Sequence, residues 1–177
     1  MAELSPGLRV SSDERIHVVS LRYFDPRGAF SHTVSRVVGL ELPNICHASV
    51  VAGGMGPHRT ILAWRSPTET LLLSDKTTLI EQLEAAAVTH PDGCIVELTG
   101  GVCVLQADGE AVPELFSRIG GQATLPGLGE ARRSRLADVP VLALQVQPGK
   151  ILLILDRVYV DHLMTWIRAT VADLTAC

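Results

Sequence analysis

The chain has 177 residues, of which 47% are hydrophobic and 19% are charged, and its mean hydropathy is +0.28. This length and composition suit a folded chain with a sizeable core and exclude a disordered one. The net charge of −4 argues against nucleic acid as a partner, since no overall positive field attracts a phosphate backbone. The apolar fraction indicates either a well-filled core or an apolar surface that meets another protein.

The first elements are expected directly after an irregular N-terminal segment. Residues 1–15 are polar and show no clear periodicity, whereas residues 16–22 have the β-branched character of a strand. A helix follows, with Asp25 as N-cap, Pro26 in its first position and Gly39 as its left-handed stop. Its apolar residues recur on one face: Phe30, Val34, Val37 and Val38.

A loop, a strand pair and a second helix complete the first half. Residues 40–59 are rich in glycine and proline and read as a loop around a short apolar piece at 49–52. Strands are expected at 61–65 and 69–73, paired across Ser66 and Pro67. Ser74 and Asp75 open the next helix, which ends at residues 91–93. Its inward face is expected to hold Leu79, Leu83, Ala86 and Ala87.

The second half repeats this order. Strands are expected at 94–98 and 102–105, then a helix from about Glu110 with Pro113 in its first turn. Its apolar stripe comprises Val112, Leu115, Phe116 and Ile119. Three strands follow at 132–137, 139–146 and 150–155; the last two are apolar on both faces and should be central. Asp156 then caps a final helix whose stripe comprises Val160, Leu163, Met164, Ile167, Val171 and Leu174.

The sequence therefore predicts an α+β fold made of duplicated βαββα-type units. We expect an irregular segment at 1–15 and one compact domain at 16–176, built of two pseudo-repeats at about 16–93 and 94–176. The longest aliphatic stretch, at 151–155, is far shorter than the ~20 residues that span a bilayer. The N-terminus lacks the features of a signal peptide, and the four cysteines show no CxxC spacing, so a cytoplasmic chain with reduced thiols is expected.

Few residues carry chemistry in a recognisable pattern. Cys46, His47 and His58 could form a thiol–base pair or half of a metal site, but no fourth ligand has suitable spacing. The glycine-rich residues 53–56 lack the Lys-Ser/Thr ending of a phosphate loop and are interpreted as a connection. Cys103 lies in an apolar strand and should be an unreactive core residue. Trp64 is expected in the core, with stacking on a flat ligand as the alternative. We therefore assign no catalytic, cofactor-binding or metal-binding residue.

Arg132, Arg133 and Arg135 form the one basic cluster. On a strand, Arg133 and Arg135 project from the same face. They could bind an acidic partner surface or a carboxylate, or they could protect a strand edge from aggregation. These three arginines are our candidate partner-contact residues.

Several stretches together resemble the gamma subunit family of heterotetrameric sarcosine oxidase. The C-terminal half carries the resemblance best, in residues 134–144 (SRLADVPVLAL), 151–156 and 159–167, the last including Asp161-His-Leu-Met-Thr-Trp-Ile167. Upstream, residues 39–43 (GLELP), 61–73 (ILAWRSPTETLLL) and 95–98 (IVEL) fall in the same order. The similarity spans roughly residues 16–174, and the family is in turn similar to the folate-binding domain of aminomethyltransferases.

The resemblance implies a non-catalytic subunit of a multi-subunit flavoenzyme that oxidises N-methylated or cyclic secondary amino acids. No cofactor is then expected on this chain, whereas FAD, FMN, NAD and tetrahydrofolate belong to partner subunits. The implied partners are larger alpha and beta flavoprotein subunits, with a small delta subunit as a further candidate; neither nucleic acid nor a membrane is expected.

The chain departs from the family pattern at residues 97–101 and 119–126, which leaves the substrate of the complex open among sarcosine, hydroxyproline, methylglutamate and opines. Two alternatives remain. One is a free-standing aminomethyltransferase-like protein that binds folate in its own pocket, although the chain has about half the usual length. The other is an unrelated α+β protein that self-associates.

Overall fold

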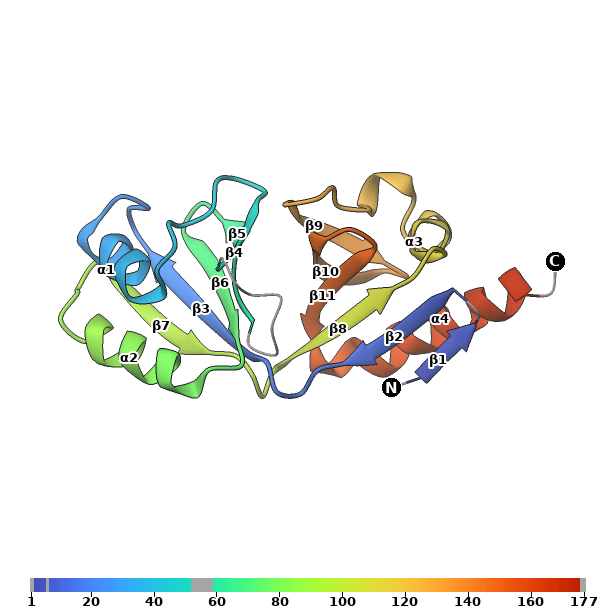
Figure 1. Ribbon diagram of the computed structural model, residues 1–177, viewed down its shortest axis with the longest axis horizontal. Helices are drawn as coiled ribbons and strands as arrows, with labels where there is room; N and C mark the ends of the chain where they lie inside the picture. The colour runs from blue at the N-terminus through green and yellow to red at the C-terminus, as the bar shows by residue number, and fades with distance from the viewer. Residues whose placement is uncertain (1, 6, 52–58, 176–177) are drawn as a thin grey trace. The chain divides into compact units, whose positions relative to one another are not determined.

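The structure is a computed structural model that describes residues 2–5, 7–51 and 59–175. The chain divides into two compact units, one formed by residues 15–99 and the other by residues 1–14 together with 100–177. Each unit contains one antiparallel sheet and two α-helices (Figure 1). The expected α+β class is confirmed.

The unit of residues 15–99 has a five-stranded sheet in the order β4-β5-β6-β3-β7. In chain order its elements are β3 (His17–Tyr23), α1 (Ala29–Val38), β4 (Ala48–Val50), β5 (Thr60–Ser66), β6 (Glu69–Ser74), α2 (Thr77–Ala87) and β7 (Gly93–Glu97). The expected strands at 16–22, 61–65 and 69–73 are therefore present. Each observed strand end lies within one residue of the predicted one. Alternate side chains of the central strands meet the two helices in one core: Val19, Leu21, Leu62, Leu72, Phe30, Val34, Ile80 and Leu83.

Helix α1 begins three residues later than the sequence predicts. Asp25 and Pro26 form a turn instead of the first helical residues, because the Asp25 carboxylate accepts the Arg27 N–H at 2.8 Å and its carbonyl accepts the Gly28 N–H at 3.0 Å. The helix start is instead capped from far along the chain, by the Asp92 carboxylate, which accepts the Phe30 N–H at 3.2 Å. Gly39 ends α1 with φ of 76°, as expected.

Helix α2 buries a slightly different face from the expected one. Leu83 is buried as predicted, and Leu79 and Ala87 pack at the margin of the core. Ile80, which the pattern did not assign inward, is 4% exposed. The inward face of α2 is thus rotated toward Ile80.

The other unit has a six-stranded sheet in the order β1-β2-β8-β11-β10-β9. In chain order its elements are β1 (Ala2–Ser5), β2 (Leu8–Ser12), β8 (Val102–Asp108), α3 (Val112–Ile119), η1 (Gln122–Thr124), β9 (Ala131–Leu136), β10 (Val139–Gln147), β11 (Lys150–Asp156), η2 (Arg157–Tyr159) and α4 (Val160–Thr175). Strand β11 lies between β8 and β10, and residues 151–155 are all 5% exposed or less, so the expectation of a central strand is confirmed.

The prediction of an irregular stretch at 1–15 is wrong, because this segment contains strands β1 and β2. Strand β2 pairs antiparallel with β8, from Arg9 opposite Asp108 to Ser12 opposite Leu105, and buries Leu8 and Val10. Pairing with a strand about a hundred residues away leaves no local signal beyond this short alternation of apolar and polar residues. The segment belongs to the same compact unit as residues 100–177.

The boundary between the repeats also differs from the predicted one. The pseudo-repeats were expected to meet between residues 93 and 94, but β7 pairs with β3 along its whole length. The change of unit therefore comes after Thr99. Gly100 and Gly101 lie at this boundary.

Helix α3 begins close to its predicted start, whereas α4 begins at Val160 and not directly after Asp156 as predicted. Helix α3 has Pro113 in its first turn and buries Val112, Leu115 and Phe116. A short 3-10 turn, η2, separates Asp156 from α4, and Asp156 makes no side-chain capping bond. Leu163, Ile167 and Val171 of α4 complete the core on this side of the sheet.

Candidate functional site

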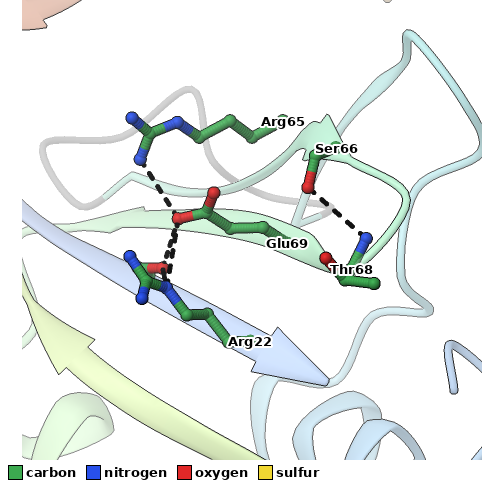
Figure 2. A network of polar contacts seen from close by, with 6 residues as sticks. Arg22, Arg65, Ser66, Thr68 and Glu69 are labelled. Atoms are coloured by element: carbon green, nitrogen blue, oxygen red, sulfur yellow. Dashed lines mark hydrogen bonds and ion pairs between the residues drawn. The ribbon is translucent and has the colours of Figure 1, made fainter. Parts of the chain in front are cut away.

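A carboxylate joins three neighbouring strands in the unit of residues 15–99. Glu69 Oε1, on β6, accepts a hydrogen bond from the Ser20 hydroxyl of β3 at 2.5 Å and from Arg65 Nη1 of β5 at 3.1 Å. Arg22 Nε lies 3.7 Å from the same oxygen and donates to the Ser20 hydroxyl oxygen at 3.3 Å. Figure 2 shows the two guanidinium groups approaching the carboxylate from opposite sides. The Glu69 side chain is 15% exposed, so its charge is compensated by these partners rather than by water.

A pocket of about 520 Å³ adjoins this network. It lies where β3 ends, β7 begins and β5 turns into β6, and it is lined by Arg22, Tyr23, Phe24, Thr68, Glu69, Pro91, Asp92, Gly93 and Cys94. The Phe24 side chain is 84% exposed, and Cys94 is exposed too. The pocket therefore presents an aromatic ring, a thiol and the half-exposed Arg22 guanidinium to an occupant.

Two polar side chains of the pocket are held by neighbouring residues. Burial raises the pKa of the Tyr23 hydroxyl above its ordinary value of 10.0, and this hydroxyl shares a hydrogen bond with Thr70 Oγ1 at 2.9 Å. Glu69 is engaged by two arginines. The arrangement is suited to holding a group in place by charge and contact.

The predicted arginine cluster lies on β9, an edge strand of the six-stranded sheet. Arg132 is half-buried and donates to Glu130 Oε2 and to the Ala123 carbonyl, each at 2.7 Å. Arg135 Nη2 donates to the Asp138 carbonyl at 2.5 Å. Arg133 and Arg135 are exposed and lie opposite Leu142 and Pro140 of β10, which places both on the same face of the sheet. The structure thus separates Arg132 from the other two candidates.

The other candidates from the sequence do not converge on a site within the described residues. Cys46 is exposed, and the His47 imidazole Nδ1 lies 2.8 Å from the Ile45 carbonyl. His58 and the glycine-rich residues 53–56 lie outside the described part of the chain. In that described part, no group of three or more His, Cys, Asp or Glu side chains is placed to hold a metal ion.

Cys103 and Trp64 were both expected in the core. Cys103 is 8% exposed and packs in the core of its unit, where burial raises the pKa of its thiol. Trp64 is only half-buried, so it does not lie in the core as expected.

Among the described residues, no helix is long and apolar enough to cross a membrane.

Sequence reasoning missed the Glu69 network and its pocket. Arg22, Arg65 and Glu69 each lie within a predicted strand, where a charged residue is uncommon, and this was the available signal. Their convergence depends on the strand order β5-β6-β3, which the local pattern does not encode.

The fold has clear counterparts among solved structures. The chain superimposes on a chain of heterotetrameric sarcosine oxidase from Corynebacterium sp. U-96, solved in complex with pyrrole 2-carboxylate, with a TM-score of 0.83. The match covers 96% of this chain and 86% of that chain at 21% sequence identity. The two chains share a fold. By sequence, no protein-family profile matches, and no curated protein does either.

An aminomethyltransferase has a related fold. The glycine cleavage system aminomethyltransferase T from Bartonella henselae matches with a TM-score of 0.68 and 11% identity over 91% of this chain. The match covers only 45% of that enzyme, so this chain spans less than half of its length. Both structural resemblances expected from the sequence are confirmed.

Proposed function

We propose that this chain is a non-catalytic, gamma-type subunit of a multi-subunit flavin-dependent amine oxidoreductase that acts on sarcosine or a related secondary amino acid. The observation that carries the proposal is the extent of the match to the sarcosine oxidase chain, which covers 96% of this chain and 86% of that chain. The matched chain is therefore itself small, as an accessory subunit would be. The aminomethyltransferase, in contrast, has more than half of its length outside the match.

The cofactors of such a complex, FAD, FMN, NAD and tetrahydrofolate, would reside in its other subunits. In a dinucleotide-binding unit, a glycine-rich turn leads from a strand to a helix whose N-terminus receives the phosphates. Here β3 leads to α1 through Asp25-Pro-Arg-Gly28, and the Asp92 carboxylate already accepts the Phe30 N–H at the start of α1. These residues do not fit a dinucleotide phosphate.

The partners in this proposal are larger alpha and beta flavoprotein subunits, with a small delta subunit as a further candidate. The resemblance to a chain of a heterotetramer supports the presence of other subunits. Exposed Arg133 and Arg135 supply one surface on which an acidic partner could dock.

Purification of the tagged chain from its native source tests the proposal. A yellow complex of higher mass that oxidises sarcosine or another secondary amino acid is the expected result. A single chain that retains folate would instead support the free-standing aminomethyltransferase-like alternative. A colourless assembly that contains only this chain would contradict both.

A further inference from the structure

Strand β7 is an edge strand with free main-chain groups. It is the last strand of the five-stranded sheet and pairs with β3 on one side only. The Leu98 N–H donates to the Val18 carbonyl, and the Asp92 carbonyl accepts the Phe24 N–H. Because hydrogen-bonding directions alternate along a strand, the N–H and C=O groups of Gly93, Ile95 and Glu97 point away from β3. Within the described residues, no main-chain bond reaches these outward groups.

The other three sheet edges carry features that discourage pairing with another chain. Strand β4 has three residues, and the pairing of β1 with β2 is irregular between Glu3 and Ser5. Strand β9 carries Arg132, Arg133 and Arg135. Short length, irregular pairing and positive charge are the usual protections of sheet edges.

Strand β7 lacks these protections. Its register with β3 is regular over all five residues, and residues 93–96 are Gly-Cys-Ile-Val, with a single charge following at Glu97. An unguarded, regular edge of this kind is a template for strand addition.

The register of β7 favours a second copy of this chain as the added strand. The outward residues Gly93, Ile95 and Glu97 are symmetric about Ile95, so an antiparallel two-fold arrangement centred there pairs all of them. Ile95 then lies opposite Ile95 of the second copy, and Glu97 lies opposite Gly93. No like charges face each other across the junction, and the central pair is apolar and β-branched, which stabilises strand pairing.

We propose that β7 pairs with β7 of a second copy, centred on Ile95, and joins the two five-stranded sheets into one. The proposal rests on this edge alone and does not depend on the function proposed above. The isolated chain should accordingly dimerise without any other subunit.

Proline at position 95 tests the edge directly. The Ile95 N–H points outward, so Ile95→Pro removes a donor of the proposed junction and leaves the ladder to β3 intact, a position that tolerates proline. Sedimentation of the isolated chain should show a dimer for wild type and for the control Ile95→Val. For Ile95→Pro, we expect dimerisation weakened about tenfold or more, with an unchanged circular dichroism spectrum.

A cross-link tests the register without relying on how well a proline variant folds. In the proposed pairing, Cys94 lies opposite Val96 of the second copy in a non-hydrogen-bonded pair, where Cα atoms are about 4.5 Å apart, close enough for a disulfide. Mild oxidation of Val96→Cys should therefore yield a covalent dimer in which mass spectrometry finds Cys94 joined to the introduced residue. A monomeric wild type at all concentrations, or a dimer lacking this cross-link, would overturn the proposal.

Discussion

At the scale of single residues, Gly93 lies where a neighbouring ring leaves no room for a side chain. A Cβ atom built at this position would lie 2.3 Å from Cγ of Phe30, which is 1% exposed in the core. Phe30 belongs to α1 and Gly93 to β7, so the contact fixes how closely the helix packs on the start of that strand. The requirement for glycine here is one of space.

We expect Gly93→Ala to lower the free energy of unfolding by about 1–3 kcal/mol, since the added methyl group forces the buried ring to shift. Gly100→Ala is the matched control, because a Cβ atom there meets nothing within 4 Å. Chemical denaturation of the two variants measures the difference. Equal stability of both would show that the Phe30 ring moves freely.

Because Tyr23 is buried, we expect the free energy of unfolding to fall at alkaline pH. Its pKa is raised in the folded state, chiefly by burial, so the folded protein holds this proton more tightly than the unfolded chain does. The resulting stabilisation is fully present below pH 10.0, the ordinary pKa of the hydroxyl, and is lost as the pH rises through the raised folded pKa. Tyr23→Phe, which has no such proton, should show a shallower alkaline decline in denaturation experiments. A parallel decline would contradict this account.

At the scale of elements, β11 is a central, buried strand of its sheet. It lies between β8 and β10, and Leu153 is 1% exposed within the core beneath the helices. An unpaired carboxylate at this position would be desolvated without compensation.

We therefore expect Leu153→Asp to prevent soluble folding, since the substitution costs several kcal/mol out of a typical total of about 5–15 kcal/mol. The control Val158→Asp introduces the same group at a side chain that is 81% exposed and should change little. Thermal unfolding compares the two. A near-normal transition for the Leu153 variant would show that the strand is not central.

The edge strand β9 gives a prediction about assembly. Changing both Arg133 and Arg135 to glutamate should leave the fold intact, because exposed charges contribute little to stability. If these arginines meet an acidic partner, the reversal places like charges opposite one another and weakens association. Pull-down of the larger subunits should fall relative to a control that reverses Arg27 and Arg36, two exposed residues at α1. Equal recovery would remove the cluster from the interface.

The sequence predicted elements well where their pattern is local. The apolar stripe of α3 and the continuous apolar run at 151–155 both reflect a periodicity that a few neighbouring residues display. Strand β2 was missed because only Leu8 and Val10 mark it, and its partner β8 is remote in the chain. The start of α1 was misplaced because Asp92, 62 residues away, provides the cap that Asp25 was expected to supply.

At the scale of the whole molecule, the division of the chain could not be read from its order of elements. Strand β7 follows α2 as though it began a second repeat, yet it completes the first sheet by pairing with β3. The pocket could not be predicted from the sequence for the same reason. Its residues Arg22, Glu69 and Cys94 come from three strands that only the sheet order brings together. The fold, by contrast, was correctly inferred from the resemblance.

The most direct test of the proposed subunit role is sedimentation of the tagged chain from its native source, monitored by the visible absorbance of flavin. Our account predicts that flavin absorbance sediments together with this chain in a complex that contains larger subunits. It also predicts that the chain carries no flavin when it is separated from them, in keeping with the absence of a dinucleotide fingerprint from its sequence. A chain that sediments without flavin and without larger subunits would contradict the account.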